Sequence, residues 1–586
     1  AALDISKLKT KKRVKGDDAK SLPVKMCKLL FTYKAQTKFV DKKGYNCLHW
    51  AAAKGNRDIL PMFLQRGCKK DFRSKAGNTA LHLASCEGKI ECVKYLLQHK
   101  ADMHIRNQYY KTAMAVAASE LPIGTLSQRK SAERLRDEIR EVFFNADSSR
   151  KTLIVHHEEC EEHEPRKSDE WEHPERIQVI MKEMKETKMF NPEKSLQHTS
   201  SFDRATVKAL LRVHSPAYIR FIHDLSKQVI KDKTVIPFTP KVQKNLGVAD
   251  AETKEDDICD TSFSSGSLPA ARRAVGAVCH AIDVVLSGKN RNAFCAVRPP
   301  GHHAGTNGLL KNATSCGFCI FNNVAVGAMH ALDHHNLNRV AIIDFDVHHG
   351  NGTEEIISGI NDPNKIFFFS THLFDRSKSY EFYPGTGKVD IIAKNISNAP
   401  MRPLWRRDSS GSVSMGRRRV SSAPLRRGRS YFRQVITQKL IPALRAYNPE
   451  LILLSSGFDG SENDVGNCNH SVGRSSCGLD LRPSDYFWVV SKIQEIASIC
   501  CNGRLISVLE GGYGQYVRNK LERKNLAKCV VAHVAALVDH NKVPLFESNG
   551  DDSDDTDESG EESSPESTIP PPDYPSNVES RKLQSD

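Results

Sequence analysis

The sequence predicts an α/β protein in which helices flank an open, mostly parallel sheet, with an all-α repeat domain in front of it. Two observations carry this prediction. Matching residues recur every 33 positions near the N-terminus, which indicates stacked helical repeats. Further along, short apolar runs that end in Gly, Asp or His alternate with helical stretches, which indicates strands joined by helices. We expect repeats over 24–130, a helical linker over 131–150, the α/β domain over 151–540 and an acidic tail over 541–586.

The repeat domain is defined by two segments that match at several positions. Residues 44–51 read GYNCLHWA and residues 77–84 read GNTALHLA, whereas a third copy at 111–118 lacks both the Gly and the His. This pattern resembles the ankyrin repeat, a turn followed by two antiparallel helices. The resemblance implies a docking surface for a protein partner that the sequence does not identify. Packing against a neighbouring domain is the alternative.

Three further segments have the apolar spacing of helices. An amphipathic helix is expected within residues 131–144 of the linker. In the α/β domain, helices are expected over 270–286 and 317–332. These helices would alternate with the strands of the sheet.

Charge is unevenly distributed along the chain. The 586 residues include 85 Lys+Arg and 70 Asp+Glu, a net charge of +15, yet residues 547–586 hold 13 acidic and 2 basic residues, a local charge of −11. The tail is expected to be disordered. The basic remainder indicates either a chromatin or nucleic-acid partner or simple solubility charge. No apolar run approaches the roughly 18 residues of a membrane-spanning helix, and because the chain does not begin with Met, we expect its natural N-terminus to lie upstream.

Four apolar runs in the α/β domain end in Gly and reactive side chains. They occupy residues 293–297, 340–344, 451–454 and 505–509. The reactive residues in or after these runs are His302, His303, Asp344, Asp346, His348, Asp459 and Tyr513. Ligand sites of open α/β sheets form at the carboxyl ends of strands, so we expect these side chains to line one crevice.

The second of these segments has the composition of a metal site. Asp344, Asp346 and His348 alternate, so an extended backbone places them on one side. Carboxylate and imidazole ligands suit zinc, and a catalytic zinc takes three protein ligands. Asp346 and His348 supply two of them, and Asp459 is the natural third.

The motifs resemble those of the zinc-dependent histone deacetylases, closer to the class II branch. The match also includes residues 152–160, 173–176, 213–218 and 382–387. The resemblance implies the arginase/deacetylase-like fold and hydrolysis of N6-acetyl-lysine in histones and other proteins, which contributes to chromatin regulation and transcriptional repression.

The same resemblance assigns roles to individual residues. It places Zn²⁺ on Asp346, His348 and Asp459. His303, beside Asn351, is expected to act as general base, and His302, paired with Asp344, as electrostatic support. Because a carboxylate favours imidazolium and an amide does not, His302 should have the higher pKa. The oxyanion-stabilising role falls on Tyr513.

Substrate contacts and a second ion also follow from the resemblance. Gly317 and Phe318 match the acetyl-lysine channel, and Asp260 matches an acidic rim residue that holds the substrate backbone. The family implies a structural K⁺ near Asp344, Asp346 and Ser370. A second channel aromatic is missing, and Ile392 stands near its place.

An Arg-rich insert at 402–433 interrupts the α/β domain. It holds ten Arg and one acidic residue and is expected to be a mobile surface loop. A phosphate-binding patch, a nuclear-import signal and a phosphorylation switch are the competing interpretations, and Ser421 and Ser422 resemble a site for 14-3-3-type adaptors. We expect a protein of the nucleus and cytoplasm, with no membrane partner and no sequence-specific DNA binding.

Three alternatives remain for the function. The substrate could be tubulin or an acetylpolyamine, which would enter the same channel. The chain could instead be a weakly active ankyrin scaffold that recruits other enzymes. A dimanganese ureohydrolase site is disfavoured because the residue two after Asp459 is Ser461 and supplies no further carboxylate.

Overall fold

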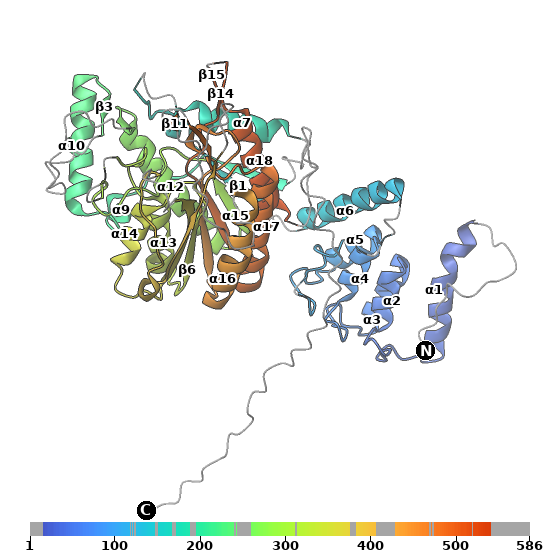
Figure 1. The fold of residues 1–586 in the computed structure, drawn as a ribbon. Coiled ribbons are helices and arrows are strands. Elements are labelled where there is room, and N and C mark those ends of the chain that lie inside the picture. The colour runs from blue at the N-terminus through green and yellow to red at the C-terminus, as the bar shows by residue number, and fades with distance from the viewer. Residues whose placement is uncertain are drawn as a thin grey trace, which may run out of the picture. The chain divides into compact units, whose positions relative to one another are not determined.

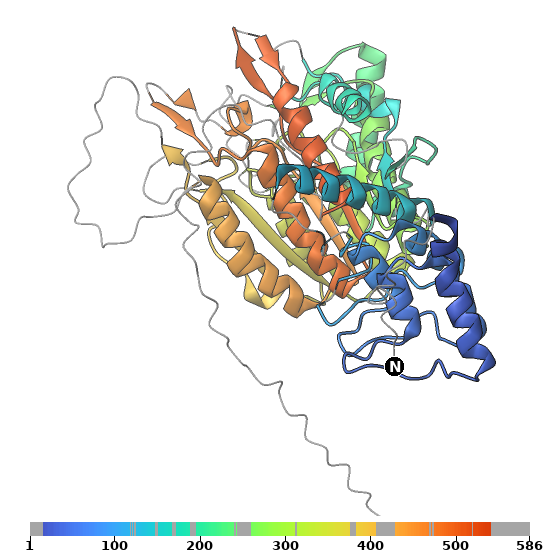
Figure 2. The same cartoon turned by 90° about the vertical axis from the view of Figure 1, so that its right-hand side faces the viewer.

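The computed structural model describes most of the chain between residues 16 and 540 (Figures 1 and 2). The residues left out within this span are 110, 118, 120, 122–124, 147–150, 167–170, 188–194, 239–241, 243–259, 311–312, 314, 375–381, 406–427, 468–469, 472–473 and 519. The acidic tail and the first 15 residues also lie outside the described part. Among the described helices, none has the length and apolar character needed to cross a membrane.

The N-terminal part is a stack of short helices after α1 (Gly16–Thr32), as Figure 1 shows. The two full repeats are the pairs α2 (Cys47–Ala53) with α3 (Leu60–Gln65), and α4 (Ala80–Cys86) with α5 (Ile90–Gln98). In the degenerate third copy, residues 113–117 form turns in place of a helix. The all-α repeat prediction is confirmed.

The repeated histidines explain why each repeat folds in the same way. Asn46 accepts a hydrogen bond from the backbone N–H of His49 at the start of α2, and Thr79 does the same for His82 in α4. The Nε2 atoms of these histidines lie 3.0 and 3.1 Å from carbonyl oxygens 29 residues further along. Each His therefore fixes one helix start and joins it to the next repeat.

Helix α6 (Leu126–Ala146) follows the repeats and contains the predicted amphipathic segment. Ile139 and Phe143 are fully buried. The apolar spacing of the linker therefore identified the packed side of this helix.

The α/β domain contains an eight-stranded sheet whose neighbouring strands all pair in parallel, which confirms the predicted fold class. In sheet order the strands are β2 (Leu196–Thr199), β1 (Thr152–Val155), β5 (Asn292–Cys295), β13 (Leu505–Leu509), β10 (Leu451–Ser456), β6 (Val340–Asp344), β7 (Ile366–Leu373) and β8 (Ile396–Met401). The inner strands are buried along their whole length. They read as continuous apolar runs because helices cover both faces.

Two helical layers cover the sheet, as the two views show (Figures 1 and 2). One layer contains α12 (Ser267–Leu286), α13 (Asn323–His334) and α14 (Asn351–Ser358). The other contains α7 (Glu175–Glu186), α16 (Ile441–Tyr447), α17 (Pro483–Cys500) and α18 (Lys524–Val538).

The remaining elements are short or peripheral. They are α9 (Val207–Leu210), α10 (Pro216–Asp232), α15 (Gly428–Val435), a π-helical turn (Ile436–Leu440), four 3-10 turns (Arg57–Ile59, Glu158–Glu161, Ile392–Lys394, Val465–Asn467), β3 (Ile236–Pro237), β4 (Ser262–Phe263), β9 (Leu404–Trp405), β11 (His470–Ser471), β12 (Arg474–Cys477), β14 (Gln515–Val517) and β15 (Lys520–Glu522).

Two predictions about local structure need correction. The helix expected over 317–332 begins only at Asn323, because Gly317 and Phe318 have φ values of 52° and 64° and Asn322 caps the helix. The Arg-rich insert is not a loop throughout, since α15 begins at Gly428.

The helical end of the insert is held by a buried acid. Arg429 and Arg433 of α15 both form ion pairs with Asp485, at 2.6 and 2.7 Å. Ser421 and Ser422 lie outside the described residues, so the adaptor-site prediction stays a prediction.

Candidate functional site

The order of strands brings the reactive segments together. Strands β5, β13, β10 and β6 are adjacent in the sheet, and each is followed by one of the four predicted segments. Because parallel strands end at the same edge, the residues that follow them gather at one edge of the sheet, which is where the ligand crevice of an open α/β sheet forms.

The three residues predicted as metal ligands form a compact triad. His348 Nδ1 lies 3.2 Å from Asp346 Oδ1 and 3.0 Å from Asp459 Oδ2. One ligand atom from each residue falls within 4.8 Å of the others. Both carboxylates are fully buried, and backbone N–H groups of Gly511 and Val347 donate to their remaining oxygens. Two carboxylates and one imidazole, fixed by further hydrogen bonds, are a donor set that fits Zn²⁺.

The tandem histidines lie beside this triad with different partners. His302 Nδ1 lies 3.0 Å from Asp344 Oδ2, and His303 Nδ1 lies 2.8 Å from Asn351 Oδ1. Burial opposes charge on both rings, but the carboxylates of Asp344 and Asp346 raise the pKa of His302 to about 10. Burial together with the nearby rings of His302 and His348 holds the pKa of His303 well below its usual range. This is the order expected from their partners.

Tyr513 lies at the end of β13, packed against two aromatic rings. Its ring centroid is 5.4 Å from that of Phe318 and 5.6 Å from that of Trp171. Burial raises the pKa of the Tyr513 hydroxyl well above its usual value, so the hydroxyl keeps its proton and can donate it in a hydrogen bond.

Asp464 fixes the position of Tyr513 and was not foreseen from the sequence. Its Oδ2 accepts hydrogen bonds from the backbone N–H groups of Tyr513 and Gly514, at 2.9 and 2.7 Å, and Oδ1 accepts one from Gly466. Burial, followed by the nearby Asp459, raises the pKa of Asp464 to about 8. The segment after Asp459 therefore carries the support for Tyr513.

The predicted substrate-contact residues lie next to the histidines. A Cβ atom on Gly317 would stand 2.3 Å from Cδ2 of His303, so only Gly leaves room for the ring. The backbone N–H of Phe318 donates to Thr261 Oγ1 at 2.8 Å. Asp260 Oδ1 accepts hydrogen bonds from the hydroxyls of Thr261 and Ser315, so its carboxylate supports this loop.

Beneath the crevice, a buried charge network joins two of the loops. Arg298 Nε and Nη2 donate to the two oxygens of Glu172, both at 2.5 Å, and Arg176 Nη1 donates to Glu172 Oε1 at 3.0 Å. Arg176 also donates to the carbonyl oxygens of Gly512 and Glu510. All three charged side chains are 2% exposed or less. Glu172 thereby fixes the loops that carry His302 and Tyr513.

Glu510 provides a second buried support that sequence reasoning missed. Its Oε2 accepts hydrogen bonds from the backbone N–H groups of Gly301 and His302, at 2.7 and 3.2 Å. Burial raises its pKa to about 7. Glu510 directly follows β13 and lies three residues before Tyr513, a position from which the sequence could have placed it at the same sheet edge.

A further aromatic lies against the histidines. Tyr383 has its ring centroid 4.9 Å from that of His303, and its hydroxyl donates to the carbonyl oxygen of Ser315 at 3.0 Å. Ile392, which stands near the place of the missing second channel aromatic, is 85% exposed. Tyr383 stood in a motif that matched the family, but its contact with the histidine was not anticipated.

Comparisons with known proteins agree with this arrangement. The family model of the histone deacetylase domain matches residues 170–535, and that of ankyrin repeats, in three copies, matches residues 19–120. Type-2 histone deacetylase 2 of Dictyostelium discoideum is 36% identical over 401 residues, covering 66% of this chain and 21% of that protein. Type-2 histone deacetylase 1 of the same organism is 30% identical over 457 residues, covering 66% and 29%. Polyamine deacetylase HDAC10 of Mus musculus is 29% identical over 284 residues, covering 48% and 35%. The chain thus spans less than a third of the length of both Dictyostelium proteins.

Proposed function

The chain belongs to the histone deacetylase family, and we propose that its α/β domain hydrolyses N6-acetyl-lysine amides with one Zn²⁺ ion. The observation that carries the proposal is the meeting of the Asp346, His348 and Asp459 triad with two histidines and Tyr513 in one crevice. When bound, Zn²⁺ supplies polarisation of the acetyl carbonyl and a lowered pKa for water.

The two histidines have different roles, proton transfer for His303 and charge stabilisation for His302. Asn351 Oδ1 accepts from His303 Nδ1, which leaves Nε2 of His303 free to take a proton from the attacking water. The same Nε2 then returns the proton to the departing lysine amine. His302 donates to Asp344 and keeps a positive ring beside the reaction, which stabilises developing negative charge.

Tyr513 and the aromatic residues complete the site. The Tyr513 hydroxyl donates a hydrogen bond to the carbonyl oxygen as its negative charge develops, a contact of the kind worth about 10²–10³ in rate. Phe318 packs against Tyr513 and would line the path of the acetyl-lysine stem. Gly317 keeps that path open beside His303.

The test compares the full chain with three variants on an acetylated peptide. Tyr513→Phe should lower kcat by about 10²–10³, and Asp459→Asn should abolish turnover and the binding of the catalytic zinc. Tyr516→Phe is the matched control, because Tyr516 lies in the same segment but is 52% exposed. Equal turnover by all four proteins would contradict the proposal.

For the substrate, we propose acetylated histones first and an acetylpolyamine second. The names of the Dictyostelium relatives support the former, and the name of the mouse relative supports the latter. Tubulin and a purely scaffolding role remain further outcomes. Turnover of acetylated histone peptides, acetylated tubulin and acetylspermidine, each with and without chelator, separates them.

The other parts of the chain suggest how the enzyme is directed. We propose that the ankyrin repeats bind a protein partner. The enzyme is expected in the nucleus, where it acts on chromatin, and also in the cytoplasm. Phosphorylation at Ser421 or Ser422 would recruit an adaptor. A structural K⁺ near Asp344 and Ser370, which face each other in neighbouring strands, belongs to the same proposal. Unchanged localisation of a chain with both serines replaced by Ala would contradict the adaptor role.

A further inference from the structure

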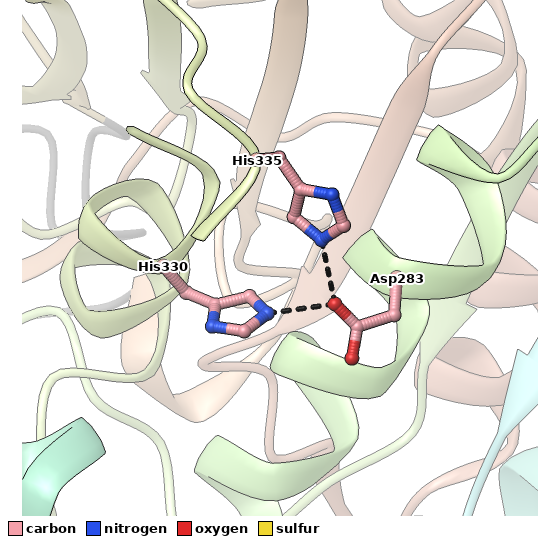
Figure 3. Close-up of side chains that lie close together, drawn as sticks. All are labelled: Asp283, His330 and His335. Carbon is pink, nitrogen blue, oxygen red and sulfur yellow. Dashed lines mark hydrogen bonds and ion pairs between the residues drawn. The ribbon is translucent and has the colours of Figure 1, made fainter. Parts of the chain in front are cut away.

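A second group of metal-ligating side chains lies on the helical layer, away from the crevice (Figure 3). Asp283 belongs to α12, His330 to α13, and His335 follows the last residue of α13. Both imidazole Nε2 atoms point at the same oxygen, Asp283 Oδ1, and each lies 2.7 Å from it. Three donor atoms from three segments therefore converge on one point.

The packing around the group holds it in this arrangement. The ring of His330 stacks on that of His334, with centroids 4.9 Å apart, and meets the ring of His335 edge-on at 5.5 Å. The two helices are in close contact, since a Cβ on Gly327 would stand 2.6 Å from Val278 Cγ1. Neither helix can shift freely, because such close-packed contacts resist movement.

Access for an ion is provided by the uneven burial of the three side chains. His330 is 10% exposed, whereas His335 is 24% and Asp283 46% exposed. The buried ring fixes one side of the group, and the carboxylate opens to solvent on the other.

We propose that Asp283, His330 and His335 form a second Zn²⁺ site, distinct from the metal-ligand triad of Asp346, His348 and Asp459. Two neutral imidazoles and one carboxylate, with a water in the fourth position, match the ligand sets of zinc proteins. Imidazole donors favour zinc over Mg²⁺ or Ca²⁺, which prefer oxygen. A bound ion would join α12 to the end of α13 and make the stability of this layer depend on zinc.

The two distances to Asp283 Oδ1 require only a small adjustment. With zinc–ligand bonds of about 2.0–2.1 Å, the ligand atoms of a tetrahedral site lie about 3.3 Å apart. The Nε2 atoms must therefore move away from Asp283 Oδ1 by about 0.6 Å, a shift that rotation of this half-exposed carboxylate can supply. Each neutral imidazole binds the ion through an unprotonated Nε2 and carries its proton on Nδ1.

The competing explanation is a bridge of two hydrogen bonds. Two imidazoles that donate to one carboxylate would also tie the helices together and would bind no ion. The experiment must therefore measure bound metal and not only stability.

Zinc content of the full chain separates the two explanations. Apo protein is dialysed against Zn²⁺ and the bound metal is counted, in an Asp459→Asn background that removes the catalytic zinc. We expect one zinc per chain in this background. Adding His335→Ala or the near-isosteric Asp283→Asn should remove that zinc, whereas adding His223→Ala should leave it bound. His223 is the matched control, because it lies 3.9 Å from Asp224 in an exposed pair with a single imidazole. The chain's cysteines are common to all variants, so thiol-bound zinc cancels in the comparison.

Thermal unfolding provides the second readout. Addition of Zn²⁺ should raise the unfolding temperature of the Asp459→Asn protein and of its His223→Ala derivative, but not of its His335→Ala derivative. Equal zinc content with and without His335, or equal zinc-induced stabilisation, would overturn the proposal in favour of the hydrogen-bonded bridge. Circular dichroism confirms that each variant is folded before its zinc is counted.

Discussion

Replacement of Glu172 by Gln tests whether the buried charge network supports the crevice. Glu172 is 2% exposed and accepts hydrogen bonds from both Arg298 and Arg176. Gln keeps the shape of the side chain but leaves two buried guanidinium groups without a negative partner. We expect a large loss of stability, because an uncompensated buried charge is among the most costly defects in a protein.

Two independent arguments give the same magnitude. Burial opposes the charge on Glu172, but Arg298, with smaller contributions from His163 and Arg176, lowers its pKa from 4.5 to about 2. At about 1.4 kcal/mol for each unit, this shift corresponds to about 3 kcal/mol of stability. Breaking a buried ion pair by removing one partner typically costs about 3–5 kcal/mol. We therefore expect Glu172→Gln to lower the free energy of unfolding by about 3 kcal/mol at pH 7.

The lowered pKa of Glu172 also predicts how the stability of the protein depends on pH. Because the pKa of Glu172 is lower in the folded than in the unfolded state, its contribution is complete above about pH 4.5 and is lost as the pH falls towards 2. The wild type should lose this stability over that window, whereas Glu172→Gln should lack this part of the slope.

Urea denaturation followed by tryptophan fluorescence measures both effects, with Glu158→Gln as control. Glu158 is exposed and lies in the segment just before the network, so its replacement should change stability by less than about 0.5 kcal/mol. A loss below 1 kcal/mol for Glu172→Gln, or a pH slope like that of the wild type, would refute the reasoning.

Two further predictions concern the loops of the crevice. Gly317→Ala should lower kcat/KM by about 10²-fold, because the new Cβ would displace His303 from its position. Gly288→Ala is the control, because Gly288 also has a positive φ but a Cβ there would meet no atom within 4 Å; this variant should introduce backbone strain and leave turnover unchanged. Asp464→Ala should lower kcat more than KM, because two backbone N–H groups at Tyr513 lose their acceptor, and should cost about 1–3 kcal/mol in urea denaturation. Turnover in Asp464→Ala equal to that of the wild type would show that Tyr513 needs no such support.

The strand ends were predictable from the sequence because their signal is local. The strands Leu451–Ser456 and Leu505–Leu509 are buried on both faces, so each reads as a mostly apolar segment that Gly follows within two residues. Residues that follow such runs directly, including His303 and Asp459, could be assigned to one crevice before the strand order was known. In the structure the ligand atoms of Asp346, His348 and Asp459 lie within 4.8 Å of one another, and the ring centroids of His302 and His303 are 3.9 Å apart.

The supporting residues were not predictable, because their signal is not local. Arg298 and Glu172 are 126 residues apart, and a charged residue reads as a surface residue unless its partner is known. Asp464 lies in a polar segment, so its carboxylate also reads as a surface group. The prediction that the helix begins at Gly317 was wrong, because Gly317 and Phe318 have left-handed backbone angles. The close packing of Gly317 against His303 accompanies this turn, and helix propensity carries no signal of it.

The place of β13 in the sheet has a consequence for how the chain folds during synthesis. This strand lies between β5 and β10, so the sheet consists of two separate halves until nearly the whole α/β domain has left the ribosome. The 336 residues between Arg176 and Gly512 take roughly 20–70 s to translate at about 5–20 residues per second. Within that interval the edge of β5 lacks its partner from Cys295 onward and that of β10 only from Ser456 onward, and Tyr513 has not yet been made. The nascent chain is therefore inactive and prone to edge-to-edge association until its last central strand is inserted.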